Sequence, residues 1–331
     1  MREMADESRR SLLKGISGAA AGFASMLAAP ATAMESSKDG DKSGKPRTLA
    51  LIGDRAHNSD AIRVSLDRVF RELDLPIDYT TNYYDLSADL LRPYRLFVCF
   101  RDNYFFPNGD ASFSSNDRQS HTNSANSDLF PNAQYWITED QGKAVREFVH
   151  SGNGLYSMHN NAFLSRSSTN YREVQGGVAL SHPALRPFKV RIVNHDHPVT
   201  RGVGDFMVTD EQHYLIYDKD PRDILLHSEN VDGLIFETTL RDPKEGGPGA
   251  SGPPLNLGTT TVSGWAHEFG EGRVVFTAVG HTIHSMWQPE HLKLQKNAIG
   301  WLLRLPVTED QATGDGQRSS PPNGGVVAED E

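Results

Sequence analysis

The sequence predicts an α/β protein in which a doubly wound parallel sheet forms a single domain. Short, continuous apolar runs alternate with amphipathic helical patterns, and turn residues separate them. Continuous apolar runs indicate strands that are buried on both faces, as parallel strands are. Regular alternation of strand and helix is typical of a parallel sheet covered by helices. A length of roughly 270 ordered residues suits one large domain and also allows two.

The elements follow in order along the chain. The helix after the first strand should have Ser59 as its N-cap, and the helix near residue 140 begins with a capping box at Thr138 and ends at Gly152. Strands are predicted at 48–53, 77–80, 95–100, 154–158, 190–193, 224–226 and 273–277, and helices at 59–73, 86–91, 138–152 and 289–303.

The N-terminus has the pattern of a twin-arginine signal peptide. Arg9-Arg10 precedes a mildly apolar stretch, and Ala31-Thr32-Ala33 is a small-residue cleavage site. We expect cleavage after Ala33 and export to the periplasm or the extracellular space. The alternative is an uncleaved anchor, but Pro30 ends the apolar run before the ~20 residues that a spanning helix needs.

Composition divides the chain into four segments. Residues 1–33 are the predicted signal peptide, 34–46 a flexible linker, 47–305 the folded domain and 306–331 a disordered tail. Two polar insertions, 108–134 and 242–258, are either functional flaps or disordered loops.

Composition limits the partners. A formal net charge of −10 argues against binding nucleic acid, and no later segment is apolar enough to span a membrane, so we expect no membrane contact after signal cleavage. The single cysteine, Cys99, cannot form an internal disulfide and should be a buried structural thiol. The chain has no Walker loop, G-x-S-x-G elbow or H-E-x-x-H helix, so no nucleotide cofactor is expected. The sequence leaves open whether the protein forms a homo-oligomer.

Polar side chains follow several predicted strands directly. Because the carboxyl ends of parallel strands meet at one edge of a sheet, these residues should share a crevice. They are Asp54, Arg55, His57 and Asn58, then Arg101, Asp102 and Asn103, then His159, Asn160 and Asn161, and finally Gly280, His281 and His284.

Two histidines and one acidic segment stand out. His159 and His281 each follow a strand, and a neutral imidazole there can bind a divalent metal, move a proton or simply bond a neighbouring loop. Asp210-Glu211 with His213 close behind could supply a carboxylate ligand and a base, or could form an exposed acidic turn. The histidines of His195-Asp196-His197-Pro198 are expected to have a structural role in a turn.

Several of these segments occur together in a familiar order, which resembles that of the ThuA-like (trehalose-utilisation) family. The resemblance covers about residues 48–303. The matching segments are Val149–Leu155 leading to His159, Gly176-Gly177, His197–Val203, Asp210-Glu211, Gly264-Trp265, Gly272–Thr277 with Gly280-His281, Trp287 and Trp301.

This resemblance implies a class I glutamine amidotransferase-like fold, which is flavodoxin-like with a mostly parallel sheet, and a role in carbohydrate catabolism. The amidotransferase cysteine is replaced in the stretch Ser157-Met158-His159-Asn160, so glutamine hydrolysis is not expected. The family's recurrent polar positions fall on His159, Glu211 and His281, with Asp210 beside them. Many relatives have a tyrosine soon after the acidic pair, whereas here Gln212 and His213 precede Tyr214.

The leading hypothesis is an exported enzyme that acts on a small carbohydrate, a sugar or a keto-sugar derivative. A divalent metal, with zinc as first choice, would be held by His159, Glu211 and His281, and Asp210, His213 or His57 would move a proton. One alternative is a structural or assembly protein. The other is a non-catalytic carbohydrate-binding module, in which sugars would stack on Trp265, Trp287, Tyr83, Tyr84, Tyr104 and Phe105.

Overall fold

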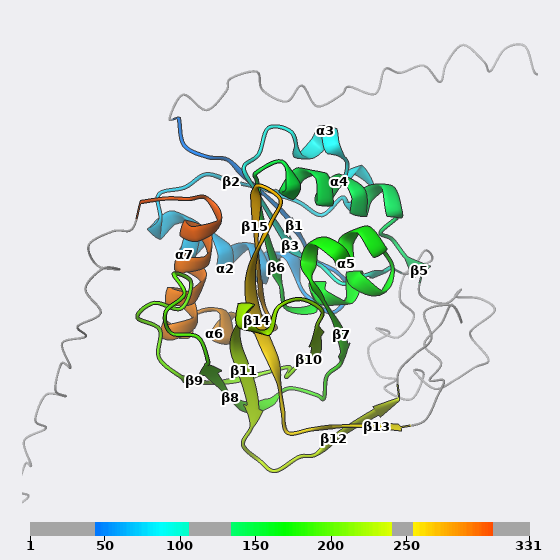
Figure 1. Ribbon diagram of the computed structural model, residues 1–331, viewed down its shortest axis with the longest axis vertical. Helices are drawn as coiled ribbons and strands as arrows, with labels where there is room; N and C mark the ends of the chain where they lie inside the picture. Colours follow the sequence, from blue (N-terminus) through cyan, green and yellow to red (C-terminus); the bar gives the residue numbers. More distant parts are fainter. Residues whose placement is uncertain (1–43, 106–133, 240–253, 307–331) are drawn as a thin grey trace, which may run out of the picture. The chain divides into compact units, whose positions relative to one another are not determined.

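A nine-stranded sheet, in the order β2-β1-β3-β6-β15-β14-β11-β8-β9, forms the centre of the computed structural model, which describes residues 44–105, 134–239 and 254–306 (Figure 1). Its first five strands are parallel to one another. When these strands are numbered by their order in the chain, they lie across the sheet as second, first, third, fourth and fifth, which is the flavodoxin-like arrangement. These strands, all predicted from the sequence, are β2 (Ile77–Thr80), β1 (Thr48–Ile52), β3 (Leu96–Phe100), β6 (Gly154–Met158) and β15 (Gly272–Thr277). The predicted α/β fold class is therefore confirmed.

Four antiparallel strands extend this parallel half of the sheet. They are β14 (Thr260–Phe269), β11 (Ile224–Asn230), β8 (Arg186–Ile192) and β9 (Phe206–Asp210). Of these, β11 and β8 are longer than the sequence predicted, and β14 and β9 were not predicted. In β9 buried and exposed residues alternate, so it lacks the continuous apolar run by which the parallel strands were found.

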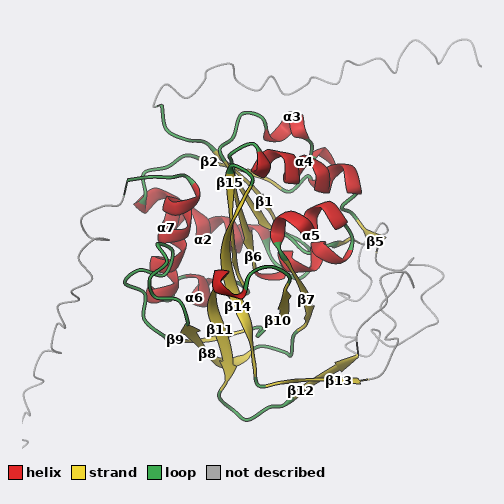
Figure 2. Ribbon diagram, in the orientation of Figure 1, coloured by secondary structure: helices red, strands yellow, loops and turns green. Residues whose placement is uncertain are grey.

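Helices cover both faces of the sheet, as a doubly wound fold requires (Figure 2). On one face lie α2 (Ser59–Glu72), α6 (Ile283–Met286) and α7 (Pro289–Leu302). On the other lie α3 (Ala88–Leu91), α4 (Glu139–His150) and α5 (Thr169–Gln175). Each face has its own apolar core, and the sheet separates the two.

The helix starts test the capping predictions. The capping box of α4 is confirmed, because the Thr138 hydroxyl accepts from the backbone N–H of Gln141 and the Gln141 side chain accepts from Thr138. The N-cap of α2 is Asn58 and not the predicted Ser59. The Asn58 side-chain oxygen accepts the N–H groups of Asp60 and Ala61, which leaves Ser59 as the first helical residue.

Short elements complete the described part of the chain. Three two-stranded sheets pair β7 (Gly177–Ser181) with β10 (Tyr214–Tyr217), β12 (Phe236–Thr239) with β13 (Pro254–Gly258), and β4 (Tyr104–Phe105) with β5 (Gln134–Tyr135). The 3-10 helices are η1 (Tyr83–Asp85), η5 (His159–Arg166) and η6 (Pro221–Asp223). Because β13 forms the end of the predicted insertion 242–258, that end is a paired strand and not a loop.

Several predictions fall on other parts of the chain. The signal peptide, nearly all of the linker and tail, and most of both insertions lie outside the described residues. Within the described part, no helix is long and apolar enough to cross a bilayer. Cys99 is fully buried on β3, and burial raises the pKa of its thiol to about 12, which confirms the predicted structural thiol.

The first residue of β15, Gly272, must be a glycine because its surroundings leave no room for a side chain. A Cβ at Gly272 would overlap the backbone carbonyl oxygens of Val149, in the last turn of α4, and Asn153, in the turn that follows. We expect Gly272→Ala to lower the free energy of unfolding by about 1 to 3 kcal/mol or more, because rigid backbone must move. Gly300→Ala is the matched control. Gly300 lies within α7, where an added Cβ would contact no neighbouring group. Because alanine favours the helix more than glycine does, this substitution should raise the free energy of unfolding by up to about 1 kcal/mol. Denaturant unfolding would measure both, and equal effects would contradict this account.

Candidate metal centre

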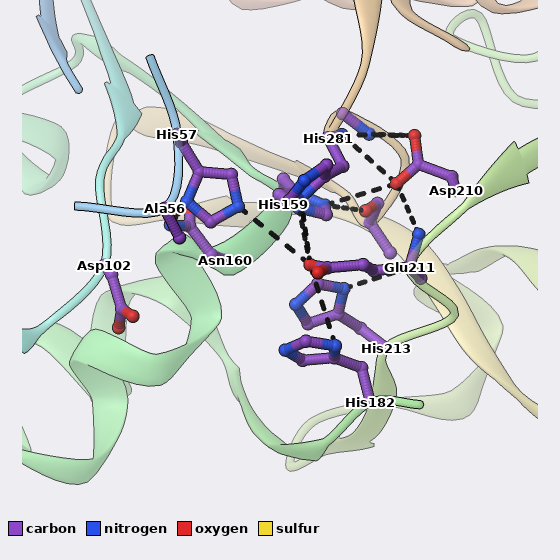
Figure 3. Close-up of polar contacts among 12 residues, drawn as sticks. Ala56, His57, Asp102, His159, Asn160, His182, Asp210, Glu211, His213 and His281 are labelled. Carbon is purple, nitrogen blue, oxygen red and sulfur yellow. Dashed lines mark hydrogen bonds and ion pairs between the residues drawn. The ribbon is translucent and has the colours of Figure 1, made fainter. Parts of the chain in front are cut away.

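Three histidines and one glutamate meet at the carboxyl ends of the sheet strands (Figure 3). His57 follows β1, His159 follows β6 and His281 follows β15, all in the parallel half. Glu211 comes from the antiparallel half, directly after β9. One potential ligand atom from each of the four residues lies within 4.8 Å of the others. This is the crevice in which ligands of open α/β sheets bind.

The three imidazoles converge on one carboxylate oxygen of Glu211. Glu211 Oε2 lies 3.1 Å from His281 Nδ1, 3.4 Å from His159 Nε2 and 4.0 Å from His57 Nε2. Among the described residues these three ring nitrogens are buried and have no partner in hydrogen-bond geometry. Buried polar atoms are normally satisfied. Three such imidazole nitrogens around one carboxylate therefore fit a shared divalent cation, which would satisfy them all.

His159 is held in an unusual backbone conformation. Its φ of 51° lies in the left-handed region, which few residues other than glycine adopt. Its Nδ1 lies 2.7 Å from the carbonyl oxygen of Ala278, so an N–H there donates to the carbonyl and leaves Nε2 for Glu211. Gly280 makes room for this, because a Cβ at that position would lie 2.8 Å from the His159 Cβ.

His57 is oriented by a buried carboxylate. Its Nδ1 lies 2.8 Å from Asp54 Oδ1, which directs Nε2 into the site, as carboxylates do for metal-binding histidines. Burial opposes protonation of His57, but the hydrogen bond and the charge of Asp54 outweigh it and raise the His57 pKa. Burial also opposes ionisation of Asp54, yet His57, the Asp102 N–H and the Asn160 amide lower its pKa to about 2.

Asp210 holds the loop that carries His281. It is fully buried at the end of β9, and its carboxylate accepts the backbone N–H groups of Gly280, His281 and Glu211. These bonds connect the end of β9 to the segment after β15. Asp210 therefore fixes two of the four converging residues, and it lies in the interior and not in the exposed acidic turn that was one alternative.

The charge of Glu211 depends on its imidazole neighbours. Burial alone would favour the neutral acid, but the contacts with His159 and His281 outweigh it and hold the Glu211 pKa well below its usual value. Glu211 is therefore a carboxylate at neutral pH, which is the form that ligates metals.

A second imidazole pair lies on the other side of Glu211. His213 follows Glu211 by two residues, and His182 follows β7; their ring centroids are 4.6 Å apart. One atom from each of His182, Glu211 and His213 lies within 4.8 Å of the others. Burial lowers the pKa of both imidazoles, so both are neutral near pH 7.

Asp102 stands at the point where the strand order reverses, after β3. It is half-buried, and its backbone N–H donates to Asp54. Burial raises the Asp102 pKa to about 7, with a further contribution from the negative charge of Asp54. A carboxyl group poised near neutrality in a crevice is typical of general acid–base chemistry.

The structure brings the six predicted site residues into one region. His159, Glu211 and His281 lie together, and His57, predicted as a proton carrier, joins the same group. His213 is beside His159, with ring centroids 4.4 Å apart, whereas Tyr214 turns away and donates to the Gly258 carbonyl. His182 was not predicted from the sequence, although it follows an apolar run as His159 does.

Two other predictions can be compared with the structure. The turn at His195–Pro198 is confirmed, and His197 there accepts the N–H of Val199. Trp265 was wrongly named as a sugar-stacking platform. It is fully buried, stacked on Phe276, and its indole N–H donates to the Gln175 carbonyl.

Comparison with known proteins identifies the family. Two solved structures are similar at low identity: a ThuA-like protein of Parabacteroides merdae (15% identity, TM-score 0.50, covering 78% of this chain and 90% of that one) and a ThuA-like protein of Bacteroides uniformis (17%, 0.49, 80% and 94%). No curated protein matches the chain. A sequence profile of ThuA, described as trehalose utilisation, matches residues 118–302, more than half of the chain. The protein is therefore a member of the ThuA family.

Proposed function

We propose that this protein is an exported, metal-dependent enzyme of carbohydrate catabolism that acts on a sugar or keto-sugar. The observation that carries the proposal is the convergence of three buried imidazole nitrogens, none with a hydrogen-bond partner among the described residues, on the carboxylate of Glu211. Membership of a family described as trehalose utilisation supports a carbohydrate substrate. The predicted twin-arginine signal at residues 1–33 supports export.

The donor set indicates the kind of metal. His57, His159, His281 and Glu211 offer three imidazoles and one carboxylate, a combination that suits zinc and related divalent ions. Asp54 behind His57 and the Ala278 carbonyl behind His159 fix which ring nitrogen faces the site. When bound, a divalent cation would polarise a carbonyl or enediolate oxygen of the substrate.

Two aspartates are assigned the remaining roles, which are positioning of the ligands and proton transfer. Asp210 keeps Glu211 and His281 in place through backbone hydrogen bonds, so we assign it a positioning role. Asp102, with a pKa of about 7, is the group that we propose to accept or return a proton at its carboxylate. It lies at the switch point of the sheet, where a substrate entering the crevice would pass.

Metal removal is the most direct test. Purified protein should contain about one or more equivalents of a divalent ion, and dialysis against EDTA should lower the melting temperature, because an ion that binds only the folded state stabilises it. His159→Ala and His281→Ala should lose the ion held by these residues and weaken the response to EDTA. His150→Ala, an exposed histidine at the end of α4, is the control and should keep both. Metal content unchanged in His159→Ala and His281→Ala would reject the site.

The raised pKa of Asp102 leads to a separate prediction about how stability depends on pH. Because its folded-state pKa is raised from 3.8 to about 7, the folded protein binds a proton more tightly than the unfolded chain, and this contribution to stability is lost as pH rises from about 4 to 7. Asp102→Asn should therefore stabilise the metal-free protein at pH 8 but not at pH 4, by up to about 1.4 kcal/mol for each tenfold difference in proton affinity between the folded and unfolded states. Thermal unfolding at the two pH values measures this, and the same effect at both would contradict it.

Substrate tests separate an enzyme from a binding module. We expect metal-loaded protein to convert 3-keto-glycosides, and Asp102→Asn to lower kcat more than KM because a proton carrier acts in the reaction and not in binding. Affinity for these sugars with no turnover by the metal-loaded protein would support the carbohydrate-binding module instead. Isothermal calorimetry and product analysis would distinguish the two outcomes.

A further inference from the structure

We infer that His182 and His213 hold a second divalent cation, which shares Glu211 with the first. This inference rests on the proposed function, since it adds a position to the same centre. The second position lies on the side of Glu211 away from His57 and His281, between the loop after β7 and the start of β10 (Figure 3).

The number of ligands is the first argument. Five imidazoles surround Glu211, and together they make six potential ligands. A four-coordinate catalytic ion uses three protein ligands and keeps one position open, and His57, His159, His281 and Glu211 already supply more than that number. His182 and His213 are therefore in excess of what one such ion can use, although both approach the same carboxylate.

The geometry of the excess pair is the second argument. His182 Nδ1 lies 3.6 Å from Glu211 Oε2 and 3.0 Å from the Pro183 carbonyl oxygen, so an ion bound there would replace the contact with that carbonyl. His213 Nδ1 lies 3.2 Å from the Glu211 carbonyl oxygen, so an N–H there donates to the backbone and Nε2 keeps a free lone pair. That Nε2 is buried and has no hydrogen-bond partner among the described residues, as is true of the three nitrogens in the first group.

A purely structural role for His213 leaves its buried, unpartnered Nε2 unexplained among the described residues. A histidine that only supports a loop needs one hydrogen bond and can turn its other nitrogen to solvent. His213 is almost completely buried and packs between the rings of His159 and His182, with centroids 4.4 and 4.6 Å away. Edge-to-face packing of neutral rings is itself favourable, but it leaves the buried His213 Nε2 without a hydrogen-bond partner among the described residues, and a cation would supply that partner.

Two cations sharing one carboxylate define a substrate class. In such sites the ions lie about 3.5 to 4 Å apart and bind two oxygens of one ligand. Adjacent oxygens of that kind occur in sugars as a hydroxyl beside a carbonyl or as vicinal hydroxyls. The inference thus replaces the proton-moving role predicted for His213 and deepens the proposed carbohydrate specificity.

Metal counting with defined variants tests the inference. EDTA-treated protein is dialysed against excess Zn²⁺, desalted and analysed for zinc per chain, with circular dichroism as a check on folding. We expect two ions in the wild type and one in His182→Ala and in His213→Ala. Glu211→Gln should weaken the binding of both ions, because a neutral amide replaces the carboxylate that they share. His150→Ala is the control and should retain two. If an alanine variant fails to fold, His182→Gln and His213→Gln give the same reading with less loss of packing.

Spectroscopy provides a second readout. Protein loaded with Mn²⁺ should give the electron paramagnetic resonance signal of two coupled ions, and His213→Ala should give that of an isolated ion. One ion in the wild type, unchanged in His182→Ala and His213→Ala, would overturn this inference and leave the proposed function intact. No ion in the wild type would overturn both.

Discussion

A buried carboxylate enclosed by imidazole rings is the interaction on which the site depends. Glu211 has lost most of its hydration, and burying a charge is costly unless it is compensated. In this protein the compensation comes from histidines on separate strands, each held by its own hydrogen bond: His57 by Asp54 and His159 by the Ala278 carbonyl. The strand ends must therefore be correctly placed before the charge can be accommodated, which ties the geometry of the site to the completion of the sheet.

The two halves of the sheet contribute different chemistry. The parallel half supplies His57, His159 and His281 at its carboxyl edge, as is general for flavodoxin-like folds. The antiparallel half supplies Glu211 at the end of β9, and Asp210 beside it bonds the backbone after β15. Neither half alone holds both the imidazoles and the acid. The extension of the sheet is thus part of the site and not an appendage to it.

The sequence could predict the parallel half because its strands are continuous apolar runs and its helices carry clear caps. It also pointed to His159 and His281, which follow such runs directly. It could not predict the left-handed backbone at His159, where Gly280, in the segment after the adjacent strand β15, leaves the space for the side chain. Nor did it reveal β9, whose apolar residues Phe206 and Val208 alternate with exposed ones, so the residues alone left open whether Asp210-Glu211 supplies ligands or forms an exposed acidic turn. The role of Asp54 behind His57 needed coordinates too.

The order in which the converging residues occur along the chain has a consequence for biogenesis. His57 lies near the start of the domain and His281 near its end, so the four are united only after almost all of the domain has left the ribosome. A growing chain has no complete set of donors with which to retain an ion. The proposed ion would therefore be captured by the finished fold, and the metals available in the compartment where folding ends would decide which one is bound.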